Sequence, residues 1–182
     1  ENSGGLGIES LELKAVEAMG STDRSLDISA PAPTLKMPEG GSLLLISGGT
    51  GLAPMIQGFR FAMKRADRFQ KVVLMHSERR RAAISEDLIT NIKESLRGQH
   101  PPQLRIHFTF TGEDDGTSFQ GFEHSVSTGR LGPKHLSDVW GSVAPGEDSI
   151  CIVSGPQGMM DAMAPIVKTV GFKEESIHLL EA

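Results

Sequence analysis

The stretch LLLISGGTGLAPM, residues 43–55, decides the fold. It opens with a continuous apolar run, the pattern of a strand that is buried on both faces of a parallel sheet. Gly48, Gly49 and Gly51 follow, and glycine lets the backbone take positive φ angles and approach a ligand closely. Pro54 suits the first turn of a helix, where a missing N–H removes no intrahelical hydrogen bond. The stretch therefore predicts a buried strand that turns tightly into a helix, and the N–H groups at such a helix start favour a pyrophosphate.

Strands and helices continue to alternate along the chain. Apolar runs typical of strands occupy residues 71–77, 104–112, 149–154 and 176–180. Helical spacing of apolar residues occupies 53–66, 84–98 and 134–143, and a fourth helix is expected after Gly155-Pro156. The Gly- and Ser-rich residues 118–133 are expected to form a loop. This order predicts an α/β fold: a doubly wound, mostly parallel sheet of five or six strands with helices on both faces.

The N-terminal part has a different texture. Residues 11–17 alternate between apolar and ionic side chains, which favours an edge strand. Residues 24–41 are expected to form one short strand followed by a connection that prolines break. We therefore divide the chain into an N-terminal extension, residues 1–40, and an α/β domain, residues 41–182.

Two glycine turns follow predicted strands: SGGTG at residues 47–51 and SGPQG at residues 154–158. In an open parallel sheet, ligands bind outside the carboxyl ends of the strands. Both turns lie at such ends, so they are expected to form opposite lips of one cleft.

Composition excludes several classes of function. The net charge of −5 argues against a nucleic-acid binder, and no apolar run is long enough for a membrane span. The single Cys151 excludes an internal disulfide framework and a cysteine metal site. The six histidines lack HxxxH and HxH spacing, so no metal site is expected.

Known motifs fit the first turn only in part. A P-loop needs Gly-Lys-Ser/Thr, which the chain lacks, and no GxSxG elbow occurs. The dinucleotide fingerprint GxGxxG is half met, because Pro54 stands where its last glycine belongs. On this motif alone, a tight turn that binds no ligand remains an alternative.

Four motifs occur in a characteristic order: GGTGLAP (48–54), VVLMHSERR (72–80), GRLGPKHL (129–136) and CIVSGPQGMMDAM (151–163). Together they resemble the pyridine-nucleotide-binding domain of the ferredoxin–NADP reductase superfamily, as in flavin reductases, cytochrome b5 reductases and oxygenase reductases. The resemblance covers residues 42–182.

The resemblance implies a nicotinamide-nucleotide site between the two turns. The first turn would line the pyrophosphate and nicotinamide side, the second would close over the nucleotide from the opposite side, and residues 76–80 would lie near the adenosine half. The implied binding residues are Gly48, Gly49, Thr50, Gly51 and Pro54; His76, Ser77, Glu78, Arg79 and Arg80; Gly129 and Arg130; and Gly155, Pro156, Gln157, Gly158 and Met159. Thr50 and Ser154 are the implied catalytic residues.

One residue departs from the family pattern. The family usually places a cysteine before the second Gly-Pro, close to the reacting nicotinamide carbon, and here that residue is Ser154. Serine keeps a small polar group at this position, which is compatible with hydride transfer. Cys151 lies three residues earlier, and we expect it to be a buried strand residue.

The choice between NADH and NADPH depends on charge. A 2′-phosphate requires a cationic clamp, whereas an acidic side chain binds free ribose hydroxyls. The plant-type NADPH enzymes of the superfamily place a Ser-Arg pair after the third strand, but this chain has Thr111-Gly112-Glu113. Glu78 could bind the ribose, whereas the arginines at 79–81 could hold a phosphate or form a solvated helix entry. We favour NADH.

Enzymes of this superfamily pass a hydride from the nicotinamide to FAD, which a preceding β-barrel holds. The chain has no tyrosine for the barrel's Arg-x-Tyr-Ser/Thr motif, so residues 1–40 can supply only a short remnant of that barrel. The resemblance therefore implies a flavoprotein reductase domain whose partners are the nicotinamide nucleotide, a flavin domain in cis or on another chain, and an electron acceptor. A non-catalytic nucleotide-binding or regulatory module is the alternative. We expect an intracellular protein, in the cytoplasm, with a mitochondrial location left open.

Overall fold

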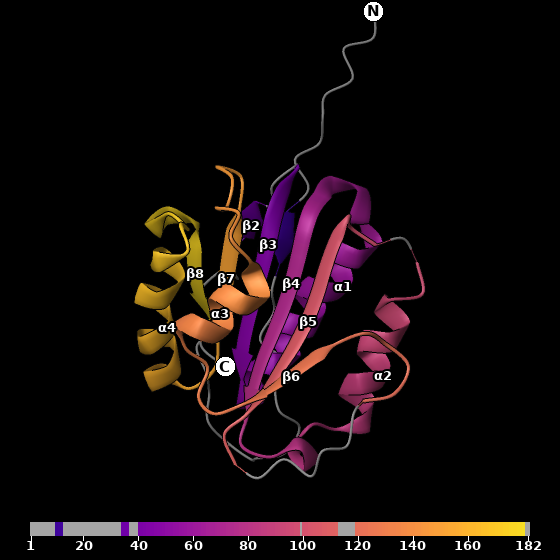
Figure 1. The fold of residues 1–182 in the computed structure, drawn as a ribbon. Coiled ribbons are helices and arrows are strands. Elements are labelled where there is room, and N and C mark those ends of the chain that lie inside the picture. The colour runs from indigo at the N-terminus through magenta and orange to yellow at the C-terminus, as the bar shows by residue number, and fades with distance from the viewer. Residues whose placement is uncertain (1–9, 13–33, 37–39, 99, 113–118, 181–182) are drawn as a thin grey trace, which may run out of the picture.

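A computed structural model describes residues 10–12, 34–36, 40–98, 100–112 and 119–180. Within these ranges, six strands form one parallel sheet in the order β6-β5-β4-β3-β7-β8 (Figure 1). The strands are β3 (Gly41–Gly48), β4 (Phe69–Glu78), β5 (Gln103–Phe110), β6 (Ser125–Thr128), β7 (Ile150–Ser154) and β8 (Ile177–Leu180). The shorter β1 (Ser10–Glu12) and β2 (Thr34–Lys36) form a separate antiparallel pair. The predicted doubly wound parallel sheet is thus confirmed.

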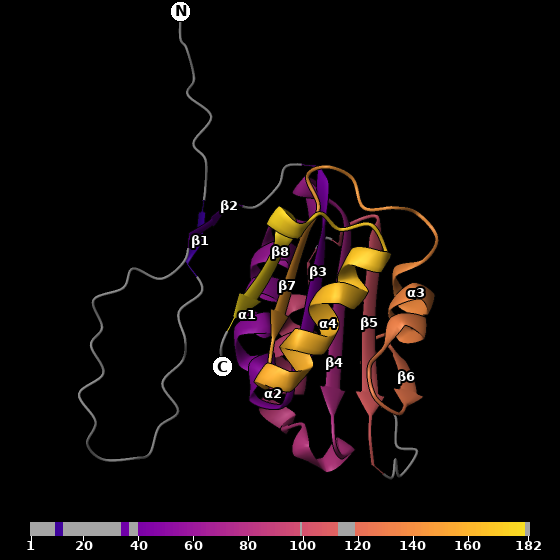
Figure 2. The same cartoon turned by 90° about the vertical axis from the view of Figure 1, so that its left-hand side faces the viewer.

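Among the described residues, four α-helices cover the sheet, and they lie on both of its faces as predicted (Figure 2). These are α1 (Leu52–Lys64), α2 (Glu86–Ser95), α3 (Pro133–Trp140) and α4 (Gln157–Thr169). Ser85 caps α2, since its side chain accepts a hydrogen bond from the N–H of Leu88, and Glu86 complements the positive end of the helix dipole. None of the described helices combines the length and the hydropathy needed to cross a membrane.

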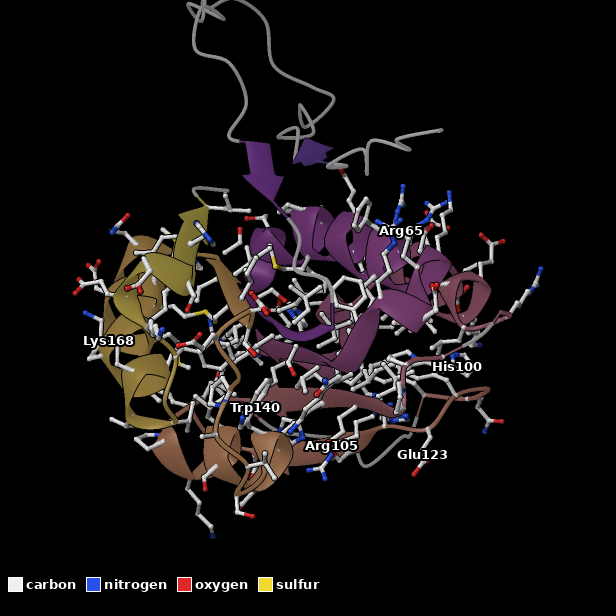
Figure 3. The ribbon with its side chains drawn as sticks, turned by 90° about the horizontal axis from the view of Figure 1, so that it is seen from above. Arg65, His100, Arg105, Glu123, Trp140 and Lys168 are labelled. Carbon is white, nitrogen blue, oxygen red and sulfur yellow. The ribbon has the colours of Figure 1, made fainter. Side chains whose placement is uncertain are left out.

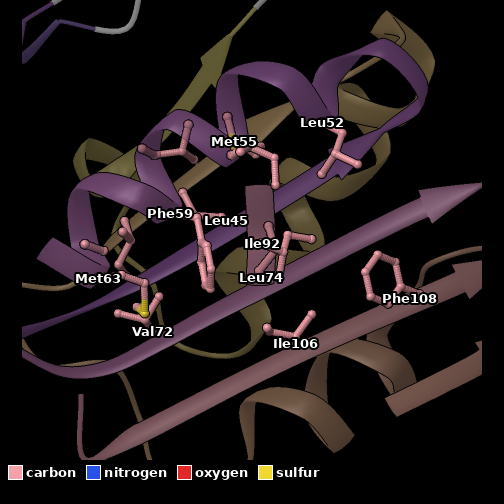
Figure 4. Close-up of a cluster of buried hydrophobic side chains, with 14 of the residues drawn as sticks. Leu45, Leu52, Met55, Phe59, Met63, Val72, Leu74, Ile92, Ile106 and Phe108 are labelled. Carbon is pink, nitrogen blue, oxygen red and sulfur yellow. The ribbon is translucent and has the colours of Figure 1, made fainter. Parts of the chain in front are cut away.

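The alternation of side chains along the central strands divides the core into two layers. Leu43 and Leu45 face α1 and α2, where they pack with Phe59 and Leu74 (Figure 4). The intervening Leu44 belongs to the layer beneath α3 and α4. A strand that is buried on both faces in this way needs apolar residues at every position, which explains the unbroken run LLLI.

Trp140 anchors the second layer. Its ring packs at a steep angle against Phe172, with 4.9 Å between the ring centres, and the ammonium of Lys71 lies 4.1 Å from the centre of its indole. Figure 3 shows Trp140 inside the fold, whereas Lys168 extends from the periphery. The single tryptophan is therefore a core residue.

Two parts of the chain differ from the sequence prediction. The loop expected at residues 118–133 contains β6, which pairs in parallel with β5. This strand was missed because it is polar: Ser125 and Ser127 hydrogen-bond the two ring nitrogens of His107, at 2.8 and 2.9 Å, instead of packing into a core. In addition, β2 lies within the proline-broken connection expected at residues 24–41. The rest of the strand expected at residues 11–17, beyond β1, lies outside the described residues.

Replacing Leu45 tests the first core layer. Leu45 has no exposed surface and lies in the centre of the sheet, so Leu45→Ala leaves a cavity and should lower the free energy of unfolding by about 3 kcal/mol. Leu179→Ala is the matched control, because this side chain is 44% exposed and its loss should cost about 0.5 kcal/mol or less. Urea denaturation followed by circular dichroism measures both; equal losses would contradict the assigned core.

The only cysteine offers a chemical test of the same fold. Cys151 has no exposed surface, and its burial raises the pKa of the thiol well above the ordinary value. It should react with a chromogenic disulfide reagent only after the protein unfolds. Labelling in buffer at the rate measured in concentrated urea would show that β7 is not an interior strand.

Candidate functional site

The sheet changes winding direction between β3 and β7. From β3 the chain proceeds through β4, β5 and β6 on one side, and then returns to add β7 and β8 on the other. Two neighbouring parallel strands therefore send their following segments in opposite directions, which opens a crevice at their carboxyl ends. Both glycine turns lie at this crevice, as the sequence predicts.

The turn after β3 is short and closely packed. Residues 49–51 form one turn of 3₁₀ helix, with Gly49 at a φ of 53°, and α1 follows directly. Gly51 has no room for a side chain: a Cβ atom there would lie 2.3 Å from the carbonyl oxygen of Ser154. A Cβ atom on Gly48 would lie 2.2 Å from the sulfur of Met159. Glycine is needed at position 51, where the clash is with backbone, whereas a side chain at position 48 would require Met159 to move.

The turn after β7 completes this contact. Gly155 has a φ of 155°, and a Cβ atom there would lie 3.0 Å from the carbonyl oxygen of Gly48. Pro156 follows, and α4 begins at Gln157. The two turns thus pack backbone against backbone at the switch point of the sheet.

A cavity of about 390 Å³ lies over these turns, which is in the usual size range of small-molecule sites. It is lined by Gly48, Gly49, Ser77, Glu78, Arg79, Thr111, Arg130, Leu131, Pro156, Gly158, Met159, Ala162 and Met163. No atom lies within 4 Å of the Cβ position at Gly49 or Gly158, so the backbone there is open to a ligand. The three segments predicted to meet, namely the two turns and the end of the second strand, do share one cavity.

Four lining residues were not predicted as site residues. Ala162 and Met163 lie three and four residues after Met159, the spacing that places side chains on one helix face, so their position could have been inferred. Leu131 directly follows the predicted Arg130. Thr111 follows β5, and its N–H donates to the carbonyl oxygen of Glu78 at 3.0 Å.

The other predicted residues lie around the cavity and not in its lining. Gly51, His76, Ser154 and Gly155 are buried, Pro54 is half-buried, and Thr50, Arg80, Gly129 and Gln157 are exposed. The amide of Gln157 donates to the carboxylate of Asp161 at 2.8 Å. The roles of all these residues stay predictions.

Ser154 is unusual among the buried polar residues. It has no exposed surface, and its hydroxyl has no hydrogen-bond partner among the described residues. Buried hydroxyls are rarely left unpaired, because removing one from water without a replacement bond costs about 1–3 kcal/mol. Ser154 lies at the switch crevice, but it does not line the cavity.

The charged groups of the lining come from the last residue of β4, from the residue directly after it, and from the segment after β6. Arg79 and Arg130 provide guanidinium groups, and Glu78 provides a carboxylate. One oxygen of Glu78 accepts a hydrogen bond from the N–H of Arg79 at 2.7 Å. Two arginines beside the start of α4 form an environment that suits a phosphate group.

The third arginine of the run has a different place. Arg81 is buried, and its guanidinium lies 3.9 Å from the ring centre of Phe119. The sequence analysis considered the arginines at 79–81 together, but only Arg79 of the three lines the cavity.

His76 lies beneath the cavity wall. Its Nδ1 is 2.9 Å from the hydroxyl of Ser47, and its Nε2 is 3.9 Å from a carboxylate oxygen of Glu78. Burial lowers the pKa of His76 to about 4, and the Ser47 bond offsets this only in part. The imidazole is therefore neutral at physiological pH.

A larger groove of about 880 Å³ lies elsewhere, between β5, β6 and α3, and none of the predicted site residues lines it. Its most buried polar group, His107, has both ring nitrogens bonded to serine hydroxyls. Burial, followed by the neighbouring His135, lowers the pKa of His107 to about 4. Arg105 in the same groove donates to the carbonyl oxygen of Val139 at 2.7 Å. These contacts join β5, β6 and α3.

Among the described residues, no group of three or more His, Cys, Asp or Glu side chains could hold a metal ion.

Comparison with known proteins identifies the family of the α/β domain. Residues 45–164 match the family model of the oxidoreductase NAD-binding domain. NADH-cytochrome b5 reductase 1 of Lodderomyces elongisporus is 30% identical over 133 residues, which are 72% of this chain and 40% of that protein. The bovine NADH-cytochrome b5 reductase 1 is 29% identical over 72% of this chain and 39% of its own length. The chain thus spans about 40% of the length of these relatives.

Solved structures show the same fold. The cytochrome b5 reductase domain of Ulva prolifera nitrate reductase superposes with a TM-score of 0.60 and 20% identity, over 82% of this chain and 52% of that one. The CS-b5R domains of human Ncb5or, in the NAD⁺ form, give a TM-score of 0.59 and 18% identity, over 77% and 36% of the two chains. The matched family model includes β4, β5 and β7 and both glycine turns, and the chain belongs to the oxidoreductase NAD-binding domain family.

Proposed function

We propose that the chain binds NADH at the switch-point cavity and presents it to a flavin, FAD, that is held mainly by a separate domain. The observation that carries this proposal is the pair of glycine turns packed against each other beneath a cavity with two arginines and one glutamate. This arrangement offers open backbone, a helix start and cationic groups to a pyrophosphate.

The residues of the chain bind and orient the nucleotide. Arg79 and Arg130 neutralise the pyrophosphate, while the open backbone at Gly49 and Gly158 lets it approach closely. Thr50 offers an exposed hydroxyl at the first lip, and Ser154, which is fully buried and outside the cavity lining, directly precedes the second lip. When bound, the dihydronicotinamide supplies a hydride, which the flavin takes up together with a proton.

Glu78 supports NADH over NADPH. Its carboxylate lines the cavity and can accept hydrogen bonds from the ribose hydroxyls of the adenosine half. The 2′-phosphate of NADPH in the same place would lie beside the Glu78 carboxylate, and the two negative charges would repel each other, although Arg79 and Arg130 would attract the phosphate. The names of the two reductases compared above specify NADH for those proteins.

The remaining parts of the reaction belong outside the α/β domain. We assign residues 1–40 to the end of a flavin-binding barrel, because β1 and β2 are an antiparallel pair outside the parallel sheet. Relatives named cytochrome b5 reductases suggest a one-electron haem protein as the final acceptor. The flavin domain is in cis or on another chain.

A second candidate is a nucleotide-binding module without hydride transfer. It is favoured by Ser154, which stands in place of the usual cysteine and is fully buried. Steady-state reduction of ferricyanide by the flavin-loaded full-length protein separates the two functions. Turnover with NADH supports the reductase, whereas binding without turnover supports the module.

Titration of the chain with NADH and NADPH tests the proposed site. The wild-type chain should bind NADH more tightly than NADPH in isothermal titration calorimetry. Glu78→Gln should weaken NADH about tenfold and reduce the preference, because a charged acceptor for ribose hydroxyls is lost. Arg130→Ala should weaken both nucleotides by similar factors.

Glu147→Gln is the matched control for charge. Glu147 is exposed, does not line the cavity and pairs with Lys173 at 3.2 Å, so nucleotide affinity should not change. Absence of binding of either nucleotide at concentrations up to about 1 mM would refute the proposed site.

Gly51→Ala tests the contact between the turns. Its Cβ atom would meet backbone atoms of Ser154, which cannot rotate away, so the turns must separate. We expect a loss of stability of about 2 kcal/mol and a large loss of NADH affinity. Gly98→Ala is the control, because no atom lies within 4 Å of its Cβ position. Thermal unfolding and calorimetry measure the two effects, and wild-type behaviour of Gly51→Ala would contradict the close packing.

A further inference from the structure

Three polar side chains form a continuous path from the first glycine turn to the wall of the cavity. They are Ser47, which directly precedes that turn, His76, and Glu78, which lines the cavity. We infer that His76 is a positioning residue: held by Ser47, it orients the Glu78 carboxylate for recognition of the ribose. This inference rests on the proposed NADH site and names a residue that determines its specificity from outside the lining.

The register of the sheet places these side chains together. Ser47 on β3 is the parallel partner of His76 on β4, and Glu78 lies two residues further along the same strand. Because side chains alternate between faces, Ser47, His76 and Glu78 share the face that carries Leu45 and Leu74. The three polar groups thus replace the apolar layer at the carboxyl end of the sheet.

Contacts with Ser47, Phe108 and Glu78 surround the imidazole. Its Nδ1 lies 2.9 Å from the Ser47 hydroxyl, and its ring meets Phe108 edge-on with 6.3 Å between ring centres. Its Nε2 lies 3.9 Å from one carboxylate oxygen of Glu78, while the other oxygen accepts from the N–H of Arg79. The carboxylate therefore lies between the backbone N–H of Arg79, which donates to it, and the imidazole edge, whose separation of 3.9 Å is longer than a hydrogen bond and leaves a charge–dipole interaction.

The carboxylate also selects the tautomer of the neutral ring. If Nδ1 carried the proton, the lone pair of Nε2 would face the negative charge of Glu78, which is unfavourable. If Nε2 carries the proton, its N–H points toward the carboxylate, and the Ser47 hydroxyl donates to Nδ1. The hydroxyl can do so, because the carbonyl oxygen of Met75, the other acceptor near it, is more distant at 3.4 Å. A fixed N–H dipole next to the recognition carboxylate resembles the outer partners that orient ligand-binding groups in other sites.

A spectroscopic measurement tests the path without any nucleotide. In long-range ¹H–¹⁵N spectra of the 182-residue chain, His76 should show the Nε2–H tautomer at neutral pH. Glu78→Ala should raise the population of the Nδ1–H form, because the charge that disfavours it is gone. An Nδ1–H tautomer in the wild type, or a population unchanged by Glu78→Ala, would overturn the inference even if NADH binds as proposed.

A double-mutant cycle tests the link to recognition. His76→Asn keeps an acceptor for Ser47, but its side chain is too short to bring an amide N–H to the place of Nε2 beside Glu78, so it should weaken NADH binding about fivefold in the wild-type background. In the Glu78→Ala background the same substitution should have no further effect. His76→Gln, whose longer side chain restores a donor, should recover most of the affinity. Additive effects, or equal losses with Asn and Gln, would show that His76 acts only through packing.

If neither the wild-type protein nor any variant binds NADH, the proposed function fails. The tautomer measurement alone then decides whether His76 orients Glu78.

Discussion

The close approach of two backbone turns is the constraint on which the site depends. Gly51 contacts the backbone of Ser154, and Gly155 contacts that of Gly48, with no side chain between them. This contact brings the starts of α1 and α4 to the same place at the switch point of the sheet. Each turn is thus part of the other's packing surface, and residues of both turns line the same cavity.

The sheet supplies the rigidity for this contact. β3 has parallel neighbours on both sides, β4 and β7, and helices cover both of its faces. The strand is therefore held in four directions, which leaves little freedom at its carboxyl end. Irregular geometry at a ligand site is tolerated when the surrounding structure determines it in this way. The polar Ser47 and His76 can be buried here because each satisfies the other.

Much of the fold follows from the sequence because its strands are apolar without interruption. The runs at Leu43 and Val72 and the glycine turns that follow the strands have local causes that can be read along the chain. β6 could not be inferred, since its serines gain stability from His107, a residue of another strand. Likewise, composition does not separate Arg79, which lines the cavity, from Arg81, which packs on Phe119. That distinction depends on tertiary contacts.

The pairing of β6 with the sheet lowers the entropic cost of binding a nucleotide at the proposed site. The residues after it return to the sheet, where the N–H of Gly129 donates to the carbonyl oxygen of Phe110 at 2.8 Å. Arg130 thus extends from a backbone that is already anchored, although it follows a segment with the composition of a loop. Binding of a nucleotide at the proposed site would then restrict the Arg130 side chain, at an entropic cost of about 0.5–1.5 kcal/mol, and not a whole loop. A short polar strand at the sheet edge preorganises the cation.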